Sequence, residues 1–258
     1  FAVELFGTFL LALEFHKLGY AKPLWSALFH CVSAFSTAGF SIYGQGLTLF
    51  RDDLSVNLII AFLCYAGAIG FIIPMDIYKK VVDKNHNITF TTKVILFITA
   101  LVCVGGTALY LVKSDHNVLA AFFQVMSAST TAGFNTVNIG ALSTTSLSVL
   151  IAAMVIGASP SGTGGGIKTT SISVLLGVVQ SVMRGQFKQI CFLNRTIPFN
   201  RVFTSIAAAT TYIFTLIIVV YLLTLTEPFS FLELCFEAAS ALGTVGFLMG
   251  VSADLFLG

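Results

Sequence analysis

Three copies of one short pattern carry the residues of this sequence that could do chemistry. FHCVSAFSTAGF (29–40), FQVMSASTTAGF (123–134) and FEAASALGTVGF (236–247) share Phe, Ser, Ala, Thr, Gly and Phe at the same offsets, without gaps. Each copy ends in T-x-G-F, where glycine can adopt backbone angles closed to residues with a β-carbon. Successive carbonyl oxygens of such a turn can face one axis and replace the water around a cation. The pattern therefore predicts cation coordination by main-chain oxygen.

The candidate ligands are the three residues before the last Phe of each copy: Thr37, Ala38, Gly39, Thr131, Ala132, Gly133, Thr244, Val245 and Gly246. We expect the ion at the carbonyls of Thr37, Gly39, Thr131, Gly133, Thr244 and Gly246. Because this set holds no carboxylate, it suits a weakly hydrated monovalent ion better than Ca²⁺ or Mg²⁺. By analogy with potassium channels, Phe40, Phe134 and Phe247 are expected to buttress the backbone of this filter.

The residue after the first shared Phe is polar in every copy: His30, Gln124 and Glu237. Each would lie about two turns below the filter. A polar side chain inside a membrane segment pairs with a neighbour or marks an ion path. We expect a packing or helix-orienting hydrogen bond rather than contact with the ion.

The composition is that of a membrane protein. Of 258 residues, 57% are hydrophobic and 9% are charged, with mean hydropathy +0.95, whereas soluble domains have about 25% charged residues. The net charge of +2 gives no reason to expect a nucleic-acid partner. The cysteines are odd in number, scattered and without a C-x-x-C pair, so they predict neither a disulfide framework nor a metal site: Cys31, Cys64, Cys103, Cys191 and Cys235.

Hydropathy predicts long spans at 54–78, 90–112, 145–182 and 199–225, and a partial one at 1–14. The stretches that hold the repeated pattern, 24–37, 118–131 and 229–243, are too short to cross. Read singly, they could be buried amphipathic surface helices. Their repetition at spacings of 94 and 113 residues, in the same order of span, short helix and span, favours re-entrant helices. Both ends fall within apolar sequence, so we expect an internal piece of a longer protein.

The span at 145–182 is interrupted by a dense run of helix breakers that forces irregular backbone at membrane depth. A nucleotide-binding P-loop is not expected there, because Ile167 stands where the motif requires glycine.

The loops SAFSTAGF, SASTTAGFNT and SALGTVGF resemble the second, third and fourth pore loops of the Trk/Ktr/HKT superfamily of potassium transporters. The stretch GASPSGTGGGIKTT (157–170) is similar to that family's intramembrane loop. The resemblance implies an all-α membrane protein of repeated M1-P-M2 units with pseudo-fourfold symmetry around one pore. It divides the chain into a second repeat (1–80, first helix truncated), a third (81–185) and a fourth (186–258, last helix missing). Whether the Trk or the Ktr branch applies stays open.

The resemblance further implies that the loop obstructs the cavity beneath the filter and moves on opening. The gate residues would be Gly157, Ser159, Pro160, Gly162, Thr163, Gly164, Gly165, Gly166 and Lys168. Lys168 either raises the barrier to a cation below the filter or merely snorkels to the surface. A homodimer and a cytosolic nucleotide-binding regulatory subunit of the TrkA/KtrA-like kind are implied as partners. In plant members, serine in place of one filter glycine accompanies sodium permeation.

Basic residues set the expected orientation in the cell membrane. The segment 79–93 carries four lysines, and the segment 184–201 carries Arg184, Lys188, Arg195 and Arg201, so both should be cytoplasmic and the pore-helix mouths extracellular or periplasmic. Asp76, at the inner end of its span, is expected to pair with Lys79 or Lys80.

The predicted function is potassium transport through a channel-like pore. A sodium-permeable protein, or a cation-coupled secondary transporter built from inverted repeats, is the alternative, although direct repeats argue against inversion. An enzyme is not expected, because no Ser/His/Asp, metal or paired-carboxylate arrangement clusters in the spans.

Overall fold

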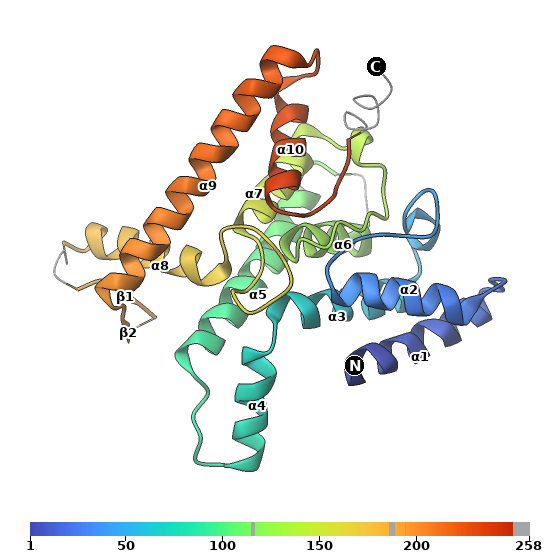
Figure 1. Cartoon of the computed structure of the whole chain (residues 1–258), viewed down its shortest axis with the longest axis horizontal. Coiled ribbons are helices and arrows are strands. Elements are labelled where there is room, and N and C mark those ends of the chain that lie inside the picture. Colours follow the sequence, from blue (N-terminus) through green and yellow to red (C-terminus); the bar gives the residue numbers. More distant parts are fainter. Residues whose placement is uncertain (115–116, 186–188, 194, 250–258) are drawn as a thin grey trace.

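The computed structural model describes residues 1–114, 117–185, 189–193 and 195–249. These form three successive helical units, in each of which a short helix follows a longer one (Figure 1). The first unit contains α1 (Ala2–Lys17), α2 (Pro23–Phe35), α3 (Leu54–Ile69) and α4 (Ile72–Val82). The second contains α5 (Phe90–Leu111), α6 (Val118–Ser129), α7 (Thr144–Ile156) and α8 (Thr169–Met183), and the third α9 (Phe199–Thr226) and α10 (Phe231–Leu242). The all-α fold is as predicted.

The short helices α2, α6 and α10 each begin at residues that stabilise the N-terminus of a helix. Pro23 occupies the first turn of α2, where its missing N–H is not needed. The Asn117 side chain accepts from the Ala120 N–H at the start of α6. At α10, Ser230 and Glu233 form a reciprocal capping box. All three helices start and end within two residues of the stretches predicted to be re-entrant.

Two helices, α5 and α9, are each long and apolar enough to cross a membrane. The predicted span at 54–78 is not one straight helix: α3 and α4 pass as a span only together and meet at 90° across a short break, as in a broken span or a re-entrant loop. Gly70 ends α3 with φ +74°, and Pro74 lies in the first turn of α4. A β-carbon at Gly70 would overlap the carbonyl of Ser161, so this glycine also permits a close approach by the second unit.

The predicted interruption of 145–182 is confirmed: α7 ends at Ile156 and α8 begins at Thr169. After α8, a two-stranded antiparallel sheet, β1 (Cys191–Phe192) with β2 (Arg195–Thr196), leads into α9. Short 3-10 turns at Thr48–Phe50 and Ile139–Ala141 follow the first two repeated patterns.

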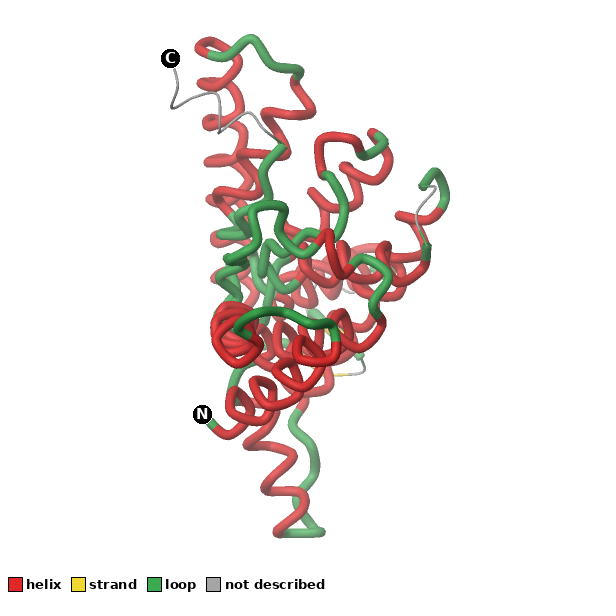
Figure 2. The backbone as a smooth tube through the Cα atoms, turned by 90° about the vertical axis from the view of Figure 1, so that its right-hand side faces the viewer, coloured by secondary structure: helices red, strands yellow, loops and turns green. Residues whose placement is uncertain are grey.

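The helix α4 and the segment after it project from the helical body (Figures 1 and 2). Asp76 fastens this projection to the start of α5, because its carboxylate accepts from His86 Nε2 at 2.9 Å and from the Thr89 N–H at 2.7 Å. The expected pairing of Asp76 with Lys79 or Lys80 is wrong. Those lysines follow on the same helix, whereas the carboxylate points to the segment that returns toward α5.

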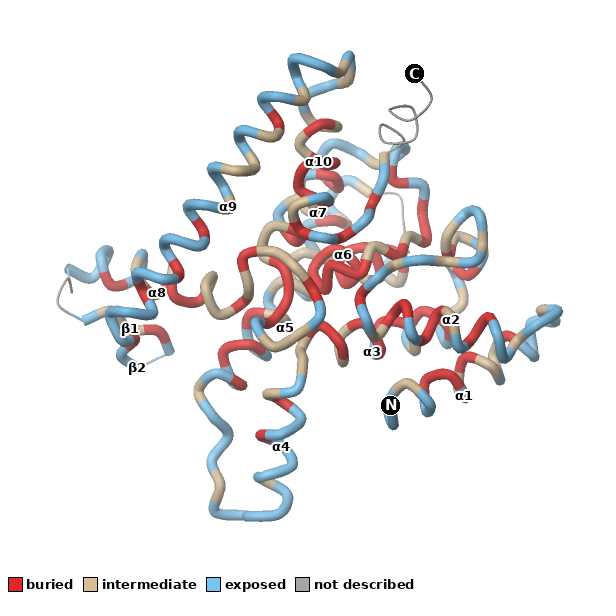
Figure 3. The backbone as a smooth tube through the Cα atoms, viewed as in Figure 1, coloured by how far each residue is buried: buried red, intermediate tan, exposed pale blue. Residues whose placement is uncertain are grey.

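The core is centred on α6, nine of whose 12 residues are buried (Figure 3). One face of α6 contributes Phe123 and Met126 to an apolar cluster with α1, α2 and α3. The other contributes Ala121 and Val125 to a cluster with α7 and α10. Each unit therefore shares its core with its neighbour, and this packing brings the C-terminal ends of the three short helices together.

Candidate cation-coordination site

The three short helices end in one and the same backbone motif. In α2, the N–H of Ala38 donates to the Ser33 carbonyl at 2.8 Å and the N–H of Thr37 donates to Ala34 at 3.1 Å. Equivalent bonds join Ala132 to Ser127 and Thr131 to Ala128, and Val245 to Ser240 and Thr244 to Ala241. This is a Schellman termination, in which the residue after the cap is left-handed and is usually glycine.

Threonine occupies that left-handed position in all three motifs. The φ angles of Thr37, Thr131 and Thr244 are 54°, 58° and 55°. A β-branched residue there is a genuine outlier, and holding it costs on the order of 1–3 kcal/mol. The same unfavourable choice at three equivalent positions indicates that the threonine side chain is required for something other than ending a helix.

Two residues later, the pattern glycine is left-handed as well. Gly39, Gly133 and Gly246 have φ of 71°, 82° and 83°. A β-carbon on Gly39 would overlap the Ala132 carbonyl, and one on Gly133 would overlap the Val245 carbonyl. The glycines of the first two loops therefore each lie against the backbone of the next loop, in chain order.

The three glycines share one open cavity of about 610 Å³. Its wall also includes polar groups from the segments that follow the first two glycines, among them Gln45, Asn135 and Asn138. The cavity thus reaches the filter from the side opposite the helix ends. A hydrated ion has room here immediately before it would meet the carbonyl-bearing turns.

The shared serine of the pattern, to which the sequence assigned no role, holds the segment beyond the filter. Ser33 Oγ donates to the Phe40 carbonyl and Ser240 Oγ donates to the Phe247 carbonyl, each at 2.9 Å. The hydroxyl at the equivalent Ser127 is buried and has no partner among the described residues.

Two of the pattern phenylalanines pack into cores that are shared with the preceding unit. Phe134 packs in the core of the first unit, with its ring centroid 6.4 Å from that of His30, and Phe247 packs in the core of the second. Phe40 is 70% exposed. No described unit precedes that of Phe40, so its expected buttressing role stays a prediction.

The polar residues two turns below the filter make the predicted helix-orienting hydrogen bonds. His30 Nε2 pairs with Ser41 Oγ at 2.9 Å, Gln124 Nε2 donates to Thr136 Oγ1 at 3.0 Å, and Glu237 Oε1 accepts from the Met249 N–H at 2.8 Å. All three partners lie two or three residues after a filter glycine. Each bond therefore links a short helix to the segment that follows the pattern glycine.

The loop 157–168 passes directly beneath the three threonines. Thr37 donates its hydroxyl to Thr163 Oγ1 at 2.9 Å, and the Gly165 N–H donates to Thr131 Oγ1 at 2.8 Å. A β-carbon on Gly165 would come within 2.5 Å of Thr244 Oγ1, and one on Gly164 within 2.5 Å of the Thr130 carbonyl. Three consecutive loop residues thus touch all three filter threonines, which gives the strained threonines a partner on their inner side.

Hydrogen bonds join the two ends of the loop 157–168, and further hydrogen bonds attach the loop to the first unit. The Ala158 N–H donates to Gly165, and the Ile167 N–H donates to Val155 at the end of α7. At the break between α3 and α4, the last carbonyls of α3 have no partner within their helix. The loop donates hydrogen bonds to these carbonyls: the Thr163 N–H to Gly67, the Ser159 N–H to Ala68, and the Ser161 hydroxyl to Ile69.

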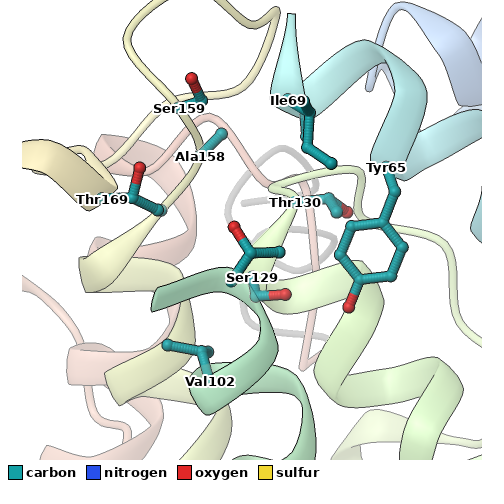
Figure 4. A pocket seen from close by; sticks show the side chains of 11 residues that line it. Tyr65, Ile69, Val102, Ser129, Thr130, Ala158, Ser159 and Thr169 are labelled. Atoms are coloured by element: carbon teal, nitrogen blue, oxygen red, sulfur yellow. The ribbon is translucent and has the colours of Figure 1, made fainter. Parts of the chain in front are cut away.

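A small cavity of about 10 Å³ lies behind this junction, near the smallest volume that holds one water. Figure 4 shows Tyr65 and Ile69 of α3, Ser129 and Thr130 at the end of α6, and Ala158, Ser159 and Thr169 around it. The Tyr65 and Thr169 hydroxyls are buried without partners among the described residues.

Lys168 is the charged residue of the loop, and its backbone is strained, with φ +85°. Its ammonium donates to the Gly164 carbonyl, one of the residues beneath the filter. The side chain therefore folds back toward the filter side of the loop rather than snorkelling freely away.

Sequence comparison bears directly on these features. The TrkH family, described as cation transport proteins, matches residues 12–257. This chain belongs to the TrkH family. The family match covers all three repeated patterns and the loop 157–168, so the site described above is contained within it.

Several curated proteins are similar to this chain in sequence. It is 34% identical over 251 residues to the Ktr system potassium uptake protein B of Vibrio alginolyticus, covering 93% of this chain and 55% of that protein. It is 32% identical over 266 residues to the Ktr system potassium uptake protein B of Bacillus subtilis strain 168, covering 98% and 59%. The potassium/sodium uptake protein NtpJ of Enterococcus hirae is 31% identical over 273 residues, covering 99% and 59%. The chain thus spans somewhat more than half the length of these relatives.

The fold agrees with a solved structure of the same family. The potassium transporter TrkH from Vibrio parahaemolyticus matches with a TM-score of 0.74 at 22% identity, covering 93% of this chain and 53% of that one. The arrangement of helix, re-entrant helix and broken helix in repeated M1-P-M2 units is therefore a fold that the family uses.

Proposed function

We propose that the protein conducts K⁺ through a pore whose filter is formed by residues 37–39, 131–133 and 244–246. The observation that carries this is the threefold recurrence of one backbone: left-handed threonine, then a residue of ordinary backbone, then left-handed glycine, around a common cavity. Alternation of this kind turns successive carbonyls toward the same side, where they can replace the water of a cation. The relatives' names, potassium uptake and potassium/sodium uptake, supply the ions to test.

The loop 157–168 is the proposed gate. Its contacts with all three filter threonines support a closed state in which the loop obstructs the inner side of the filter. Its glycines would let the loop move, and each hydrogen bond that it donates to an α3 carbonyl is individually weak. Opening requires those bonds to be exchanged for bonds to water, which is a small net change for each.

We propose that the three filter loops form part of a ring that one further loop of the same kind completes. Gly39 and Gly133 each lie against the following loop, and Phe134 and Phe247 each enter the core of the preceding unit. Gly246 and Phe40 stand at the two ends of this series, where a β-carbon on Gly246 would meet no described atom within 4 Å and Phe40 is exposed. One additional M1-P-M2 unit would supply both contacts. The division into repeats at 1–80, 81–185 and 186–258 belongs to this proposal.

In the cell membrane, the proposed orientation places 79–93 and 184–201 in the cytoplasm. Of the basic residues that set it, Lys188 lies outside the described residues. A homodimer that binds a cytosolic nucleotide-binding subunit of the TrkA/KtrA-like kind is proposed from the family resemblance. In this orientation, α4 and the basic segment 184–201 are the parts of the chain that would face such a subunit.

The test is ion flux into proteoliposomes that hold the full-length protein. With a membrane potential but no proton or sodium gradient, we expect K⁺ to enter faster than Na⁺, and deletion within 160–166 to raise K⁺ entry. Flux that requires a proton or sodium gradient would contradict the conductor and favour the coupled transporter. Equal K⁺ and Na⁺ entry would favour the sodium-permeable alternative.

A further inference from the structure

A second large cavity, of about 550 Å³, lies beside the proposed gate and shares no lining residue with the outer cavity. Its wall is made by the first turns of α4, α5, α8 and α9, the strand β2, and the loop residues Pro160 and Lys168. In the proposed orientation it lies on the cytoplasmic side, where the helices meet the basic segment 184–201. It is therefore a cavity at the depth of the lipid headgroups, open to the gate.

The lining is cationic and rich in hydroxyl groups. Lys168 and Arg201 are its charged residues, and no carboxylate lines it. Seven serine and threonine side chains complete the polar wall. One of them, Ser205, is only 8% exposed and has no hydrogen bond to any described residue, although it lines the cavity. Its hydroxyl lines the cavity beside the two cations, where it can donate to an anionic ligand that the cations attract.

The remainder of the lining is apolar and includes Ile72, Phe90 and Val94. A free inorganic anion gains nothing from such groups. A phospholipid has both parts, because its phosphate can pair with the cations and its glycerol and first methylenes can cover the apolar side chains. Basic cavities between helices at the cytoplasmic side are a recurrent form of anionic-lipid site.

We propose that this cavity binds the phosphate headgroup of an anionic phospholipid of the cytoplasmic leaflet, through Arg201, Lys168 and Ser205. The phosphate competes with the Gly164 carbonyl for the Lys168 ammonium. When the phosphate binds the Lys168 ammonium, the loop loses the hydrogen bond between Lys168 and Gly164 that holds it beneath the filter. Bound lipid therefore favours the open gate. The effect on flux and the assignment to the cytoplasmic leaflet rest on the proposed function, whereas the binding of the headgroup itself does not.

Binding is tested on the purified full-length protein in detergent by native mass spectrometry, with phosphatidylglycerol and phosphatidylcholine as probes. We expect the wild type to prefer phosphatidylglycerol, and Arg201→Gln to lose about tenfold in affinity for it, the effect of removing one charge-assisted pair. Arg201→Lys should retain most of the preference. Arg195→Gln, an exposed charge change in β2 outside the cavity lining, is the matched control.

Flux is tested in vesicles of phosphatidylcholine with and without phosphatidylglycerol. K⁺ flux should rise with phosphatidylglycerol in the wild type and in Arg195→Gln, while Arg201→Gln should equal the wild type in pure phosphatidylcholine and respond no further. Equal binding of both lipids, or unchanged binding in Arg201→Gln, would overturn the site. Inorganic phosphate that replaces phosphatidylglycerol would overturn its assignment to lipid. Selective lipid binding without any K⁺ flux would support the site and refute the proposed function.

Discussion

Thr37 of the first filter loop donates its hydroxyl to Thr163 of the second unit's intramembrane loop at 2.9 Å, across 126 residues of sequence. Thr37 is also strained, with φ 54°. One residue therefore joins the termination of a short helix, the filter backbone and the proposed gate. Movement of the gate exchanges this partner, so filter and gate are expected to be coupled through the threonine hydroxyls.

Replacing Thr163 by valine should raise K⁺ flux. Valine keeps the branched shape but removes the hydroxyl that accepts from Thr37, and a neutral hydrogen bond contributes about 1 kcal/mol, or roughly fivefold in the ratio of closed to open states. Potential-driven K⁺ uptake into proteoliposomes measures the change. Thr211→Val, at an exposed position of α9, is the control and should leave flux unchanged. Unaltered uptake in Thr163→Val would show that this contact does not hold the gate.

Gly133→Ser should abolish the preference for K⁺ over Na⁺. Its β-carbon would overlap the Val245 carbonyl, which is main chain and cannot rotate away. Gly19→Ser is a matched control, because Gly19 has a similar φ of +77° but open space around it. Both variants carry the left-handed penalty of about 1–2 kcal/mol, so only the overlap distinguishes them. Selectivity is read from K⁺ and Na⁺ uptake under one membrane potential, and a selective Gly133→Ser variant would refute the filter assignment.

Thr131→Val and Thr131→Ser should separate the hydroxyl from the shape of that side chain. Valine leaves the Gly165 N–H without its acceptor, which costs about 1–3 kcal/mol at a buried group, and keeps the β-branched strain. Serine keeps the acceptor. Thermal unfolding of the detergent-solubilised protein should therefore show a lower midpoint for valine than for serine. The reverse order would mean that the threonine is retained for packing alone.

Gln124→Leu should be nearly neutral for stability, whereas His30→Leu should be destabilising by about 2 kcal/mol or more. Gln124 makes one hydrogen bond, to Thr136, but its own Oε1 is buried without a partner among the described residues, so leucine removes an unfavourable group together with a favourable bond. His30 pairs with both Ser26 and Ser41 and stacks on Tyr43. Denaturant unfolding of the two variants, compared with the wild type, gives the difference directly. Equal destabilisation would contradict this account of Gln124.

The sequence predicted the short helices closely because their ends coincide with strong local signals: Pro23, Asn117 and the Ser230–Glu233 pair at one end and the T-x-G-F turn at the other. It did not predict the break after Ile69. A single glycine in an apolar run is tolerated within a helix, and the close approach of the loop to Gly70, which no local pattern shows, favours the break together with Pro74.

Within the site, residue types could be predicted but partners could not. The pattern placed His30, Gln124 and Glu237 in equivalent positions, and their hydrogen bonds are confirmed as a class. Ser41, Thr136 and Met249 were not foreseeable, because they follow a turn whose path depends on left-handed threonines. Nor could Phe40 be distinguished from Phe134 and Phe247, since its exposure depends on which unit lies beside it and not on its own segment.

Among the described residues, the proposed gate loop lies in the second unit, whereas the first unit has only the short break at Gly70 in the corresponding helix. Three or four such loops beneath one filter would occupy the same space, so a channel assembled from identical subunits could not carry this plug. Joining the repeats in a single polypeptide removes that restriction. In the proposed pore, a mutation would then alter one wall at a time, which would allow the filter to remain uniform while the gate evolves on one side.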